Sequence, residues 1–394
     1  MILLLLIFPA FSLFLFYQLY WKRRNLPPGP IPIPFIGNWT WTKKYGDCYT
    51  FWLGSEPYII IGSYQLMKET FIKDGDTYVD KKPQQYQQEF RGGDFGVMET
   101  NGPFWRDHRR FALSSLRDLG FGKDLMQQKI LIEVEEMFKK YDEQLGVEQN
   151  VPKVMDQGVA NVINQLLFGY RFDEEKEQEY QKIQDLLNDQ QAKFTRSKIL
   201  VECFLPFLSD WMPKPTVKEL IEEYKEKIHE ELDQVIGGDR LVTTADKHDL
   251  VYMQAFLNES QRCANIVPIN VFHMTTRDTE IRGFKISKGT GVIAQISTVM
   301  LDEKVFPEPY TFNPDRFIEH GKLKKVEELI PFSIGKRQCL GEGLARMELF
   351  LFIANFLNRY EISPSSSGPP SIDKTLEWGV APRKFDAILK KRHS

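Results

Sequence analysis

The N-terminal part of the chain has a different hydrophobic pattern from the rest. Residues 2–21 are almost wholly apolar, and about 20 such residues span a bilayer as a helix. Lys22, Arg23 and Arg24 follow directly, and positive charge marks the cytoplasmic side of a membrane. The pattern predicts a single-pass anchor over residues 1–21, in the endoplasmic reticulum membrane of a eukaryotic cell, with the body facing the cytosol. The alternative is a cleaved signal peptide, but a basic start and a small-residue cleavage site are both missing.

A stiff connecting segment is predicted next, over residues 22–38. It is basic at first and then rich in proline, with the run Leu26-Pro-Pro-Gly-Pro-Ile-Pro-Ile-Pro34. Proline fixes φ, so such a run forms an extended and semi-rigid spacer. We expect a hinge that holds the body at a set angle to the membrane, with a generic proline-rich linker as the alternative.

The remaining residues, 39–394, alternate between short strand patterns and longer helical patterns. Tyr49 to Leu53 and Pro57 to Ile61 predict a β-hairpin, and a second hairpin is predicted from Glu280 to Ile286 and Gly289 to Ile293. Helical periodicity predicts longer elements over Asp124 to Leu145, Val154 to Phe168, Phe172 to Phe194, Thr216 to Ile236, Met253 to Cys263 and Glu342 to Leu357. The fold class expected is mainly α with small β-sheets.

Composition narrows the class of protein further. The chain has 394 residues, of which 42% are hydrophobic and 27% charged, as in soluble globular proteins. Its net charge of −3 gives no reason to expect a nucleic-acid partner. The four cysteines are widely spaced, without a disulfide framework or a CxxC metal spacing, which fits a reducing compartment.

One decapeptide carries most of the chemical information: Phe332-Ser-Ile-Gly335-Lys-Arg337-Gln-Cys339-Leu-Gly341. It predicts a loop that presents Cys339 as the thiolate ligand of a haem iron. Gly335 and Gly341 allow tight bends and close approach to the porphyrin. The guanidinium of Arg337 offers a fixed fork of donors to a haem propionate. A buried structural cysteine is the alternative for Cys339 taken alone.

The decapeptide matches the pattern F-x-x-G-x-R-x-C-x-G at every fixed position. The chain therefore resembles the cytochrome P450 family of haem-thiolate monooxygenases, from about residue 1 to its C-terminus with gaps. The resemblance implies a cytochrome P450-like fold and a haem b cofactor (iron protoporphyrin IX) with an axial cysteine thiolate.

Two further signatures support this resemblance. The family pairs an E-x-x-R motif with a downstream arginine, which here implies Glu259, Arg262 and Arg316 as a structural core beneath the haem. Asp315 stands where the family usually has glutamate. An ordinary surface ion pair is the alternative, because E-x-x-R alone is common.

The family also places a W-x-x-x-R motif on a helix beside the haem propionates. Trp105 and Arg109 match it, and spacing of four puts both on one helix side. His273 lies where many members have a propionate-binding histidine or arginine, although a structural histidine is an equally good interpretation. An apolar substrate pocket is expected by resemblance at the 93–102 loop and at residues 266–269, and core packing is an equally good interpretation of most of its apolar side chains: Phe90, Phe95, Val97, Ile266, Val267 and Ile269.

One family element has no counterpart in the chain. The motif A-G-x-[DE]-T, whose acid and alcohol relay protons on the distal side, is absent between Phe172 and Glu259. We therefore predict an internal deletion near residues 223–228, an incomplete fold, and no identified catalytic residue. A splice form, an incomplete gene model and a degenerate family member are the three explanations, and the sharp motifs elsewhere favour the first two.

The resemblance implies a reaction and its partners. A complete member inserts one oxygen atom from O2 into a lipophilic xenobiotic, steroid or fatty acid, with electrons from NADPH through a flavin reductase and with membrane lipid around its anchor. The alternatives for this chain are a haem-binding pseudoenzyme and an inert truncated product that retains no haem.

Overall fold

The computed structural model describes most of the chain beyond the hinge. The described residues are 13, 16–17, 21–29, 45–53, 56–83, 92–93, 95–120, 124–196, 220–371, 374–376 and 380–393. The predicted anchor and the second half of the predicted hinge thus lie largely outside them. None of the helices within these ranges combines the length and the apolar character needed to cross a bilayer.

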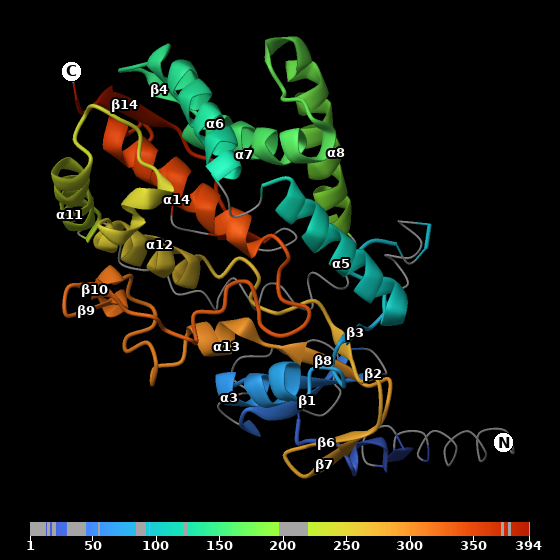
Figure 1. Cartoon of the computed structure of the whole chain (residues 1–394). Helices are drawn as coiled ribbons and strands as arrows, with labels where there is room; N and C mark the ends of the chain where they lie inside the picture. The colour runs from blue at the N-terminus through green and yellow to red at the C-terminus, as the bar shows by residue number, and fades with distance from the viewer. Residues whose placement is uncertain are drawn as a thin grey trace, which may run out of the picture.

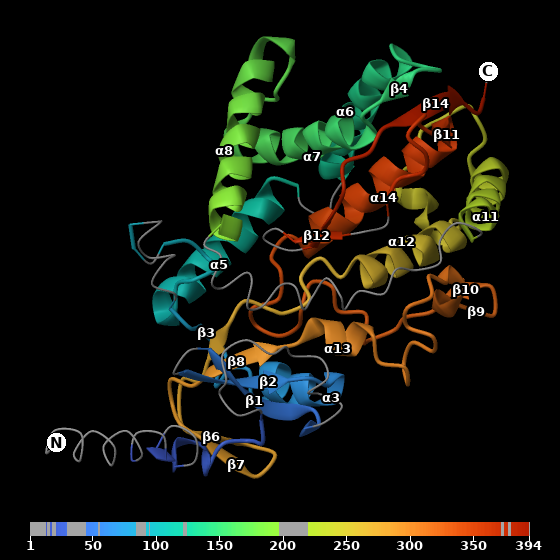
Figure 2. The same ribbon diagram turned by 180° about the vertical axis from the view of Figure 1, so that it is seen from behind.

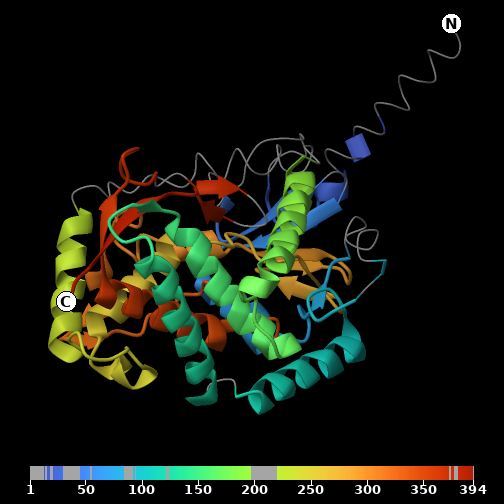
Figure 3. The ribbon, with the colours of Figure 1, turned by 90° about the horizontal axis from the view of Figure 1, so that it is seen from above.

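Helices dominate one half of the molecule, at the top of Figure 1, and cluster around the central helix α14. The α-helices are α3 (Tyr64–Met67), α5 (Gly102–Asp118), α6 (Asp124–Asp142), α7 (Val151–Phe168), α8 (Glu177–Arg196), α11 (Leu220–Val235), α12 (Val251–Ala264), α13 (Ile296–Met300) and α14 (Glu342–Arg359). A π-helix, Lys68–Lys73, continues α3. Viewed from above, α11 and α5 lie toward opposite ends of the helical half (Figure 3).

Strands form the other half, which is also seen from behind in Figure 2. The main sheet has the order β1-β2-β8-β5-β3, with β1 (Cys48–Leu53), β2 (Glu56–Ile61), β8 (Gly291–Ala294), β5 (His273–Met274) and β3 (Asp80–Lys81). A sheet β11-β14-β4 (Tyr360–Pro364, Ala387–Lys391, Glu148–Gln149) flanks the helices. The remaining pairs are β6-β7 (Thr279–Ile281, Phe284–Ile286), β9-β10 (Ile318–Glu319, Lys322–Leu323) and β12-β13 (Lys374–Leu376, Val380–Pro382). The predicted class, mainly α with small sheets, is confirmed.

Local capping explains where the helices begin and end. Helix α7 begins three residues earlier than predicted because the Asn150 side chain accepts the backbone N–H of Lys153 at 2.9 Å. It ends at Gly169 as predicted, in the left-handed region at φ 78°. Helix α8 begins later than predicted because Asp173 caps a separate 3₁₀ turn, Glu174–Lys176.

The two hairpin predictions had different outcomes. The β1-β2 hairpin is confirmed, with Cys48 opposite Ile61. The second prediction was wrong in its pairing, since β6 and β7 pair with each other around Gly283. Strand β8 instead runs parallel to β2 in the main sheet. A turn at Gly283, with φ 85°, joins β6 directly to β7. Strand β8 is therefore free to pair with β2.

Two hydrophobic cores fill the two halves. The helical core is built mainly from α6, α7, α11, α12 and α14, with Ile130, Val134 and Leu351 fully buried. The sheet core is built from the main sheet, α3 and α13, with Ile59 and Met300 fully buried. The cysteine decapeptide lies in one of the segments that run from one core to the other, between Ile330 and Leu344.

A buried ionic network fixes the region between α12 and the 300–317 segment. Arg262 binds both carboxylate oxygens of Glu259, at 2.7 and 2.8 Å, and both side chains are fully buried. Arg262 also donates to the carbonyl oxygens of Met300 and Pro309. Arg316 Nε lies 3.2 Å from Glu259 Oε1. The structure thus brings the three residues of the E-x-x-R signature together, with their donors satisfied by backbone carbonyls.

Removing the carboxylate of this network should destabilise the fold strongly. We expect Glu259→Ala to cost about 3–5 kcal/mol, because Arg262 would remain buried without its counter-charge. The matched control is Glu223→Ala, which removes an exposed helical pair with Lys227 and should cost less than about 0.5 kcal/mol. Urea unfolding of both variants measures the difference, and equal losses would contradict a special role for the buried network.

Candidate haem-thiolate site

The cysteine loop lies at the boundary between the two cores. Ile330, just before it, packs in the sheet core, and Leu344, just after it, packs in the helical core. The backbone N–H of Cys339 donates to the Phe332 carbonyl at 3.0 Å, which closes the loop. Cys339 itself is exposed and precedes the first residue of α14, Glu342, by three positions. The loop therefore presents an accessible sulfur just before a helix.

The two glycines of the loop have different backbone conformations. Gly335 has φ 85°, and a Cβ there would lie 2.3 Å from the carbonyl oxygen of Phe71 in the π-helix. Only glycine fits such a position without moving the backbone. Gly341 has φ −90°, and a Cβ at that position would have no heavy atom within 4 Å, so nothing in the described structure requires glycine there.

Helix α5 brings two predicted residues to the loop. The Arg109 side chain donates to the Gln338 carbonyl at 2.8 Å. Trp105, the one buried residue of α5, lies beneath the guanidinium of Arg337, 3.8 Å from the ring centroid. The Nε1 donor of Trp105 is buried and has no hydrogen-bond partner among the described residues. A tryptophan N–H can only donate, so this position calls for an acceptor.

Arg337 holds the loop against the segment before α5. Its Nε donates to the carbonyl of Val79 at 2.7 Å, and its Nη2 donates to that of Thr100 at 2.6 Å. Further bonds reach the carbonyl of Val97 and the side chain of Asn101. Burial lowers the pKa of Arg337 to about 9, against the opposing effect of the nearby Asp80 carboxylate. The hydrogen-bond acceptors of the guanidinium are backbone or amide carbonyl oxygens.

His273 lies on β5 next to a residue that the sequence patterns did not reveal. The Nζ of buried Lys81, on β3, is 3.0 Å from His273 Nε2 and 2.8 Å from the Val271 carbonyl. His273 Nδ1 is 2.7 Å from the Tyr78 carbonyl, which can only accept, so Nδ1 carries the proton. Burial lowers the pKa of both side chains well below their usual values. In this arrangement both ring nitrogens of His273 have protein partners.

Three basic side chains gather at this site. Lys81, Arg109 and Arg337 bond to carbonyls, an imidazole and an amide, and no ion pair joins them to a carboxylate within the described residues. Burial lowers the pKa of all three. Lys81 is buried and the two arginines are half-buried. Cations without an ion-paired carboxylate among the described residues, beside the unpartnered N–H of Trp105, suit an anionic ligand. The residues present therefore fit the two carboxylates of a haem.

The expected substrate-pocket residues lie at the surface of the described structure. Phe95 is 58% exposed, Ile266 60% and Val267 40%. Ile269 instead packs on a small cluster with Tyr58 and Ile60 in the sheet half. Phe90 lies outside the described residues.

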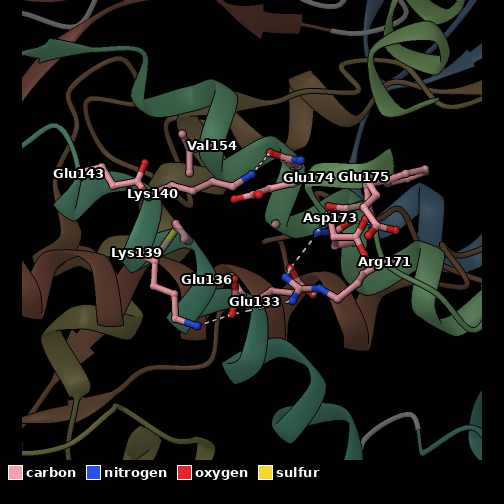
Figure 4. A pocket seen from close by; sticks show the side chains of 15 residues that line it. Glu133, Glu136, Lys139, Lys140, Glu143, Val154, Arg171, Asp173, Glu174 and Glu175 are labelled. Carbon is pink, nitrogen blue, oxygen red and sulfur yellow. Dashed lines mark hydrogen bonds and ion pairs between the residues drawn. The ribbon is translucent and has the colours of Figure 1, made fainter. Parts of the chain in front are cut away.

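A charged pocket of about 400 Å³ lies away from this site, between α6, α7 and the 171–175 segment (Figure 4). Four of its nine charged side chains form ion pairs with each other. Arg171 binds buried Glu133 at 2.9 Å, and Lys139 binds Glu136 at 2.7 Å. None of the predicted site residues lines it. The pocket is thus a structural ionic cluster rather than a part of the cysteine site.

One buried carboxyl group lacks a partner. Glu348, on α14, is 7% exposed, and its Oε1 has no hydrogen bond among the described residues. Burial alone raises the pKa of Glu348 to about 7. An unpaired acid in a core is costly when ionised, so Glu348 weakens the fold at neutral and higher pH.

The fold and the site define a class: a mainly α protein with an exposed cysteine in a loop that basic side chains contact, as in haem-thiolate proteins. The family model described as "Cytochrome P450" matches residues 27–222 and 220–389. The chain therefore belongs to the cytochrome P450 family, whose members are haem-dependent monooxygenases.

Individual relatives extend over most of the chain. Cytochrome P450 2E1 of Mus musculus is 29% identical over 95% of this chain and 95% of its own length. Cytochrome P450 2H1 of Gallus gallus is 29% identical over 87% of this chain and 88% of its own. Cytochrome P450 2C25 of Mesocricetus auratus is 28% identical over 90% and 91%.

The two loop glycines allow a matched test of the loop geometry. We expect Gly335→Ala to cost about 1–3 kcal/mol, because it adds a positive-φ strain and a clash with Phe71. Gly341→Ala should stay within about 0.5 kcal/mol of the parent protein. Thermal unfolding of both variants tests this, and a larger loss at Gly341 would show that the loop geometry is assigned incorrectly.

The unpaired Glu348 should make stability depend on pH. Its raised pKa means that the folded protein binds the proton more tightly than the unfolded chain does. This contribution to stability is complete below about pH 4.5, falls as the pH rises to about 7, and is constant above. The loss should be on the order of 3 kcal/mol. Glu348→Gln should remove this dependence, so that the variant gains stability over the parent above pH 7 and matches it near pH 4.5.

Proposed function

We propose that this chain binds haem b through the Cys339 thiolate and acts as a monooxygenase on a small lipophilic substrate. The observation that carries the proposal is the exposed Cys339 in a loop held by half-buried arginines that form no ion pair with a carboxylate among the described residues. When bound, a thiolate-ligated haem supplies dioxygen activation and inserts one oxygen atom into the substrate. The residues of the chain ligate, orient and shield the group.

The cation group orients the haem in this proposal. Trp105 and Arg109, both on α5, donate to one of the two haem carboxylates. The Nε1 of Trp105 has no partner among the described residues, so it gives up no existing bond to do so. Arg337 and Lys81 exchange their present partners, mostly carbonyl oxygens, for carboxylate oxygens, whereas His273 keeps its bond to Tyr78 and supports Lys81. A carboxylate adds the attraction of a full opposite charge that a carbonyl oxygen does not offer, which favours that exchange.

The partners follow from family membership and from the sequence. Electrons come from an NADPH-dependent flavin reductase, and the substrate is a xenobiotic, a steroid or a fatty acid. The apolar run over residues 1–21 and the basic residues after it support a single-pass anchor in the endoplasmic reticulum membrane, with the body in the cytosol. Exposed Phe95, Ile266 and Val267 are available to a lipophilic substrate.

An internal deletion limits this function. The family match breaks at residues 220–222, where α11 begins. The alignment with the mouse relative runs over 472 positions, whereas 95% of this 394-residue chain is about 374 residues. About a hundred positions of that alignment therefore have no residue of this chain. These findings support a missing segment close to the predicted junction at residues 223–228.

Exposed apolar side chains support the same interpretation. Phe111 on α5 is 73% exposed, and Leu167 and Phe168 at the end of α7 are 64% and 68% exposed. A segment carrying A-G-x-[DE]-T would supply cover and a proton relay that the chain lacks. We expect haem binding to survive this loss better than turnover does.

Spectra of the full chain in membranes test the proposal. After reduction and addition of carbon monoxide, we expect the Soret band of a thiolate–haem complex, because Cys339 is accessible. Cys339→Ala should abolish it, whereas Cys48→Ala, at a buried core cysteine, should keep it. Absence of the band in the parent protein would overturn haem binding.

Turnover with a reductase and a lipophilic substrate then separates enzyme from pseudoenzyme. We expect weak turnover or none, because the distal acid and alcohol are missing from the sequence. Rapid, well-coupled oxygenation would contradict the importance given to the deletion.

A further inference from the structure

Asn270 links the cysteine loop to the cation group. It lies between α12 and β5, and its backbone N–H donates to the Ala294 carbonyl at 2.9 Å, which attaches it to the end of β8. Its side-chain Oδ1 accepts the N–H of Val271 at 2.8 Å. This contact turns the amide so that its two Nδ2 hydrogens point away from the local backbone.

The side-chain amide of Asn270 contacts two acceptors, one in the cysteine loop and one in the cation group. Nδ2 donates to the hydroxyl of Ser333 at 2.7 Å and lies 3.2 Å from His273 Nε2. His273 Nε2 is an acceptor because Nδ1 carries the proton toward the Tyr78 carbonyl. A primary amide has two N–H donors, one for each acceptor, and His273 Nε2 shares its lone pair between Asn270 Nδ2 and Lys81 Nζ.

Ser333 is a strained position of the cysteine loop. It is a buried non-glycine residue with φ 63°, and it follows Phe332, whose carbonyl receives the N–H of Cys339. A left-handed conformation in a non-glycine residue costs about 1–3 kcal/mol and persists only where its surroundings impose it. The described contacts that hold Ser333 there are its own N–H to the Ile330 carbonyl and the bond from Asn270.

We propose that Asn270 is a positioning residue: one N–H fixes the Ser333 turn that presents Cys339, and the other fixes His273 beside Lys81. The thiolate and the anion-binding side chains thereby keep one relative position, although they belong to segments more than sixty residues apart. Two experiments test this inference. The first uses the protein without haem, and the second rests on the proposed haem function.

The first readout uses the full chain without haem. In Asn270→Ala we expect faster amide hydrogen exchange in peptides that contain Ser333 and Cys339, by about tenfold, since one turn-fixing bond is lost. The matched control is Val271→Ala, one residue further along, whose side chain is 37% exposed. Equal exchange in both variants would overturn the proposal.

The second readout uses haem-loaded protein. We expect Asn270→Ala to raise the share of the carbon monoxide complex that lacks a thiolate ligand, to shift the reduction potential, and to release haem about tenfold faster. Val271→Ala should match the parent protein. If the parent protein binds haem through its thiolate and Asn270→Ala is unchanged in all three properties, the positioning role is wrong. If the parent protein binds no haem, the proposed function fails and the exchange experiment decides the role of Asn270.

Variants of Ser333 separate the hydrogen bond from general instability. Ser333→Ala keeps the positive φ at this position but removes the hydroxyl that accepts from Asn270. Adding Asn270→Ala to that variant should therefore change amide exchange in the loop little further. Ser333→Gly adopts a positive φ freely, so it should restore slow exchange to Asn270→Ala. Additive effects and no rescue would show that Asn270 acts elsewhere. These variants also serve if Asn270→Ala alone fails to fold.

Discussion

Burial of positive charge without carboxylate partners is the constraint on which the site depends. Lys81, Arg109 and Arg337 come from three distant segments, and each is held by uncharged oxygen or nitrogen acceptors. Carbonyl dipoles compensate a buried cation only in part. The backbone at Val79 and Thr100 must therefore fold over Arg337, which draws the sheet half, α5 and the cysteine loop together. The same contacts that join the halves of the molecule also create a place for an anion.

Short motifs in the sequence identify several of the candidate site residues. The cysteine loop, the Glu259–Arg262 pair and the Trp105–Arg109 spacing each place a distinctive residue at a fixed interval along the chain. The helix ends were shifted by capping at Asn150 and Asp173, which are side-chain contacts that periodicity alone does not reveal. Fold class and helix order could thus be predicted well, and boundaries less well.

The rest depended on contacts between distant segments. Lys81 belongs to a basic pair before a proline, and nothing in that pattern distinguishes it from a solvated lysine. Its position beside His273 follows from the pairing of β3 with β5. The parallel pairing of β8 with β2 likewise joins residues far apart in the chain. Such pairings depend on the whole fold, so local patterns could not specify them.

Among the described residues, those near the cation group have most of their hydrogen-bond partners, whereas some residues on the nearby helices lack partners or cover. On the cation side almost every buried polar group that the structure describes has a partner, and the orphan donor there, Trp105 Nε1, fits a ligand. Elsewhere Glu348 is buried without a partner on α14, and large apolar side chains are exposed on α5 and α7. In the proposed function, holding a haem requires the first set of contacts, whereas shielding dioxygen and delivering protons require cover over the second. Retention of the cofactor and its use in catalysis are therefore physically separable in that proposal.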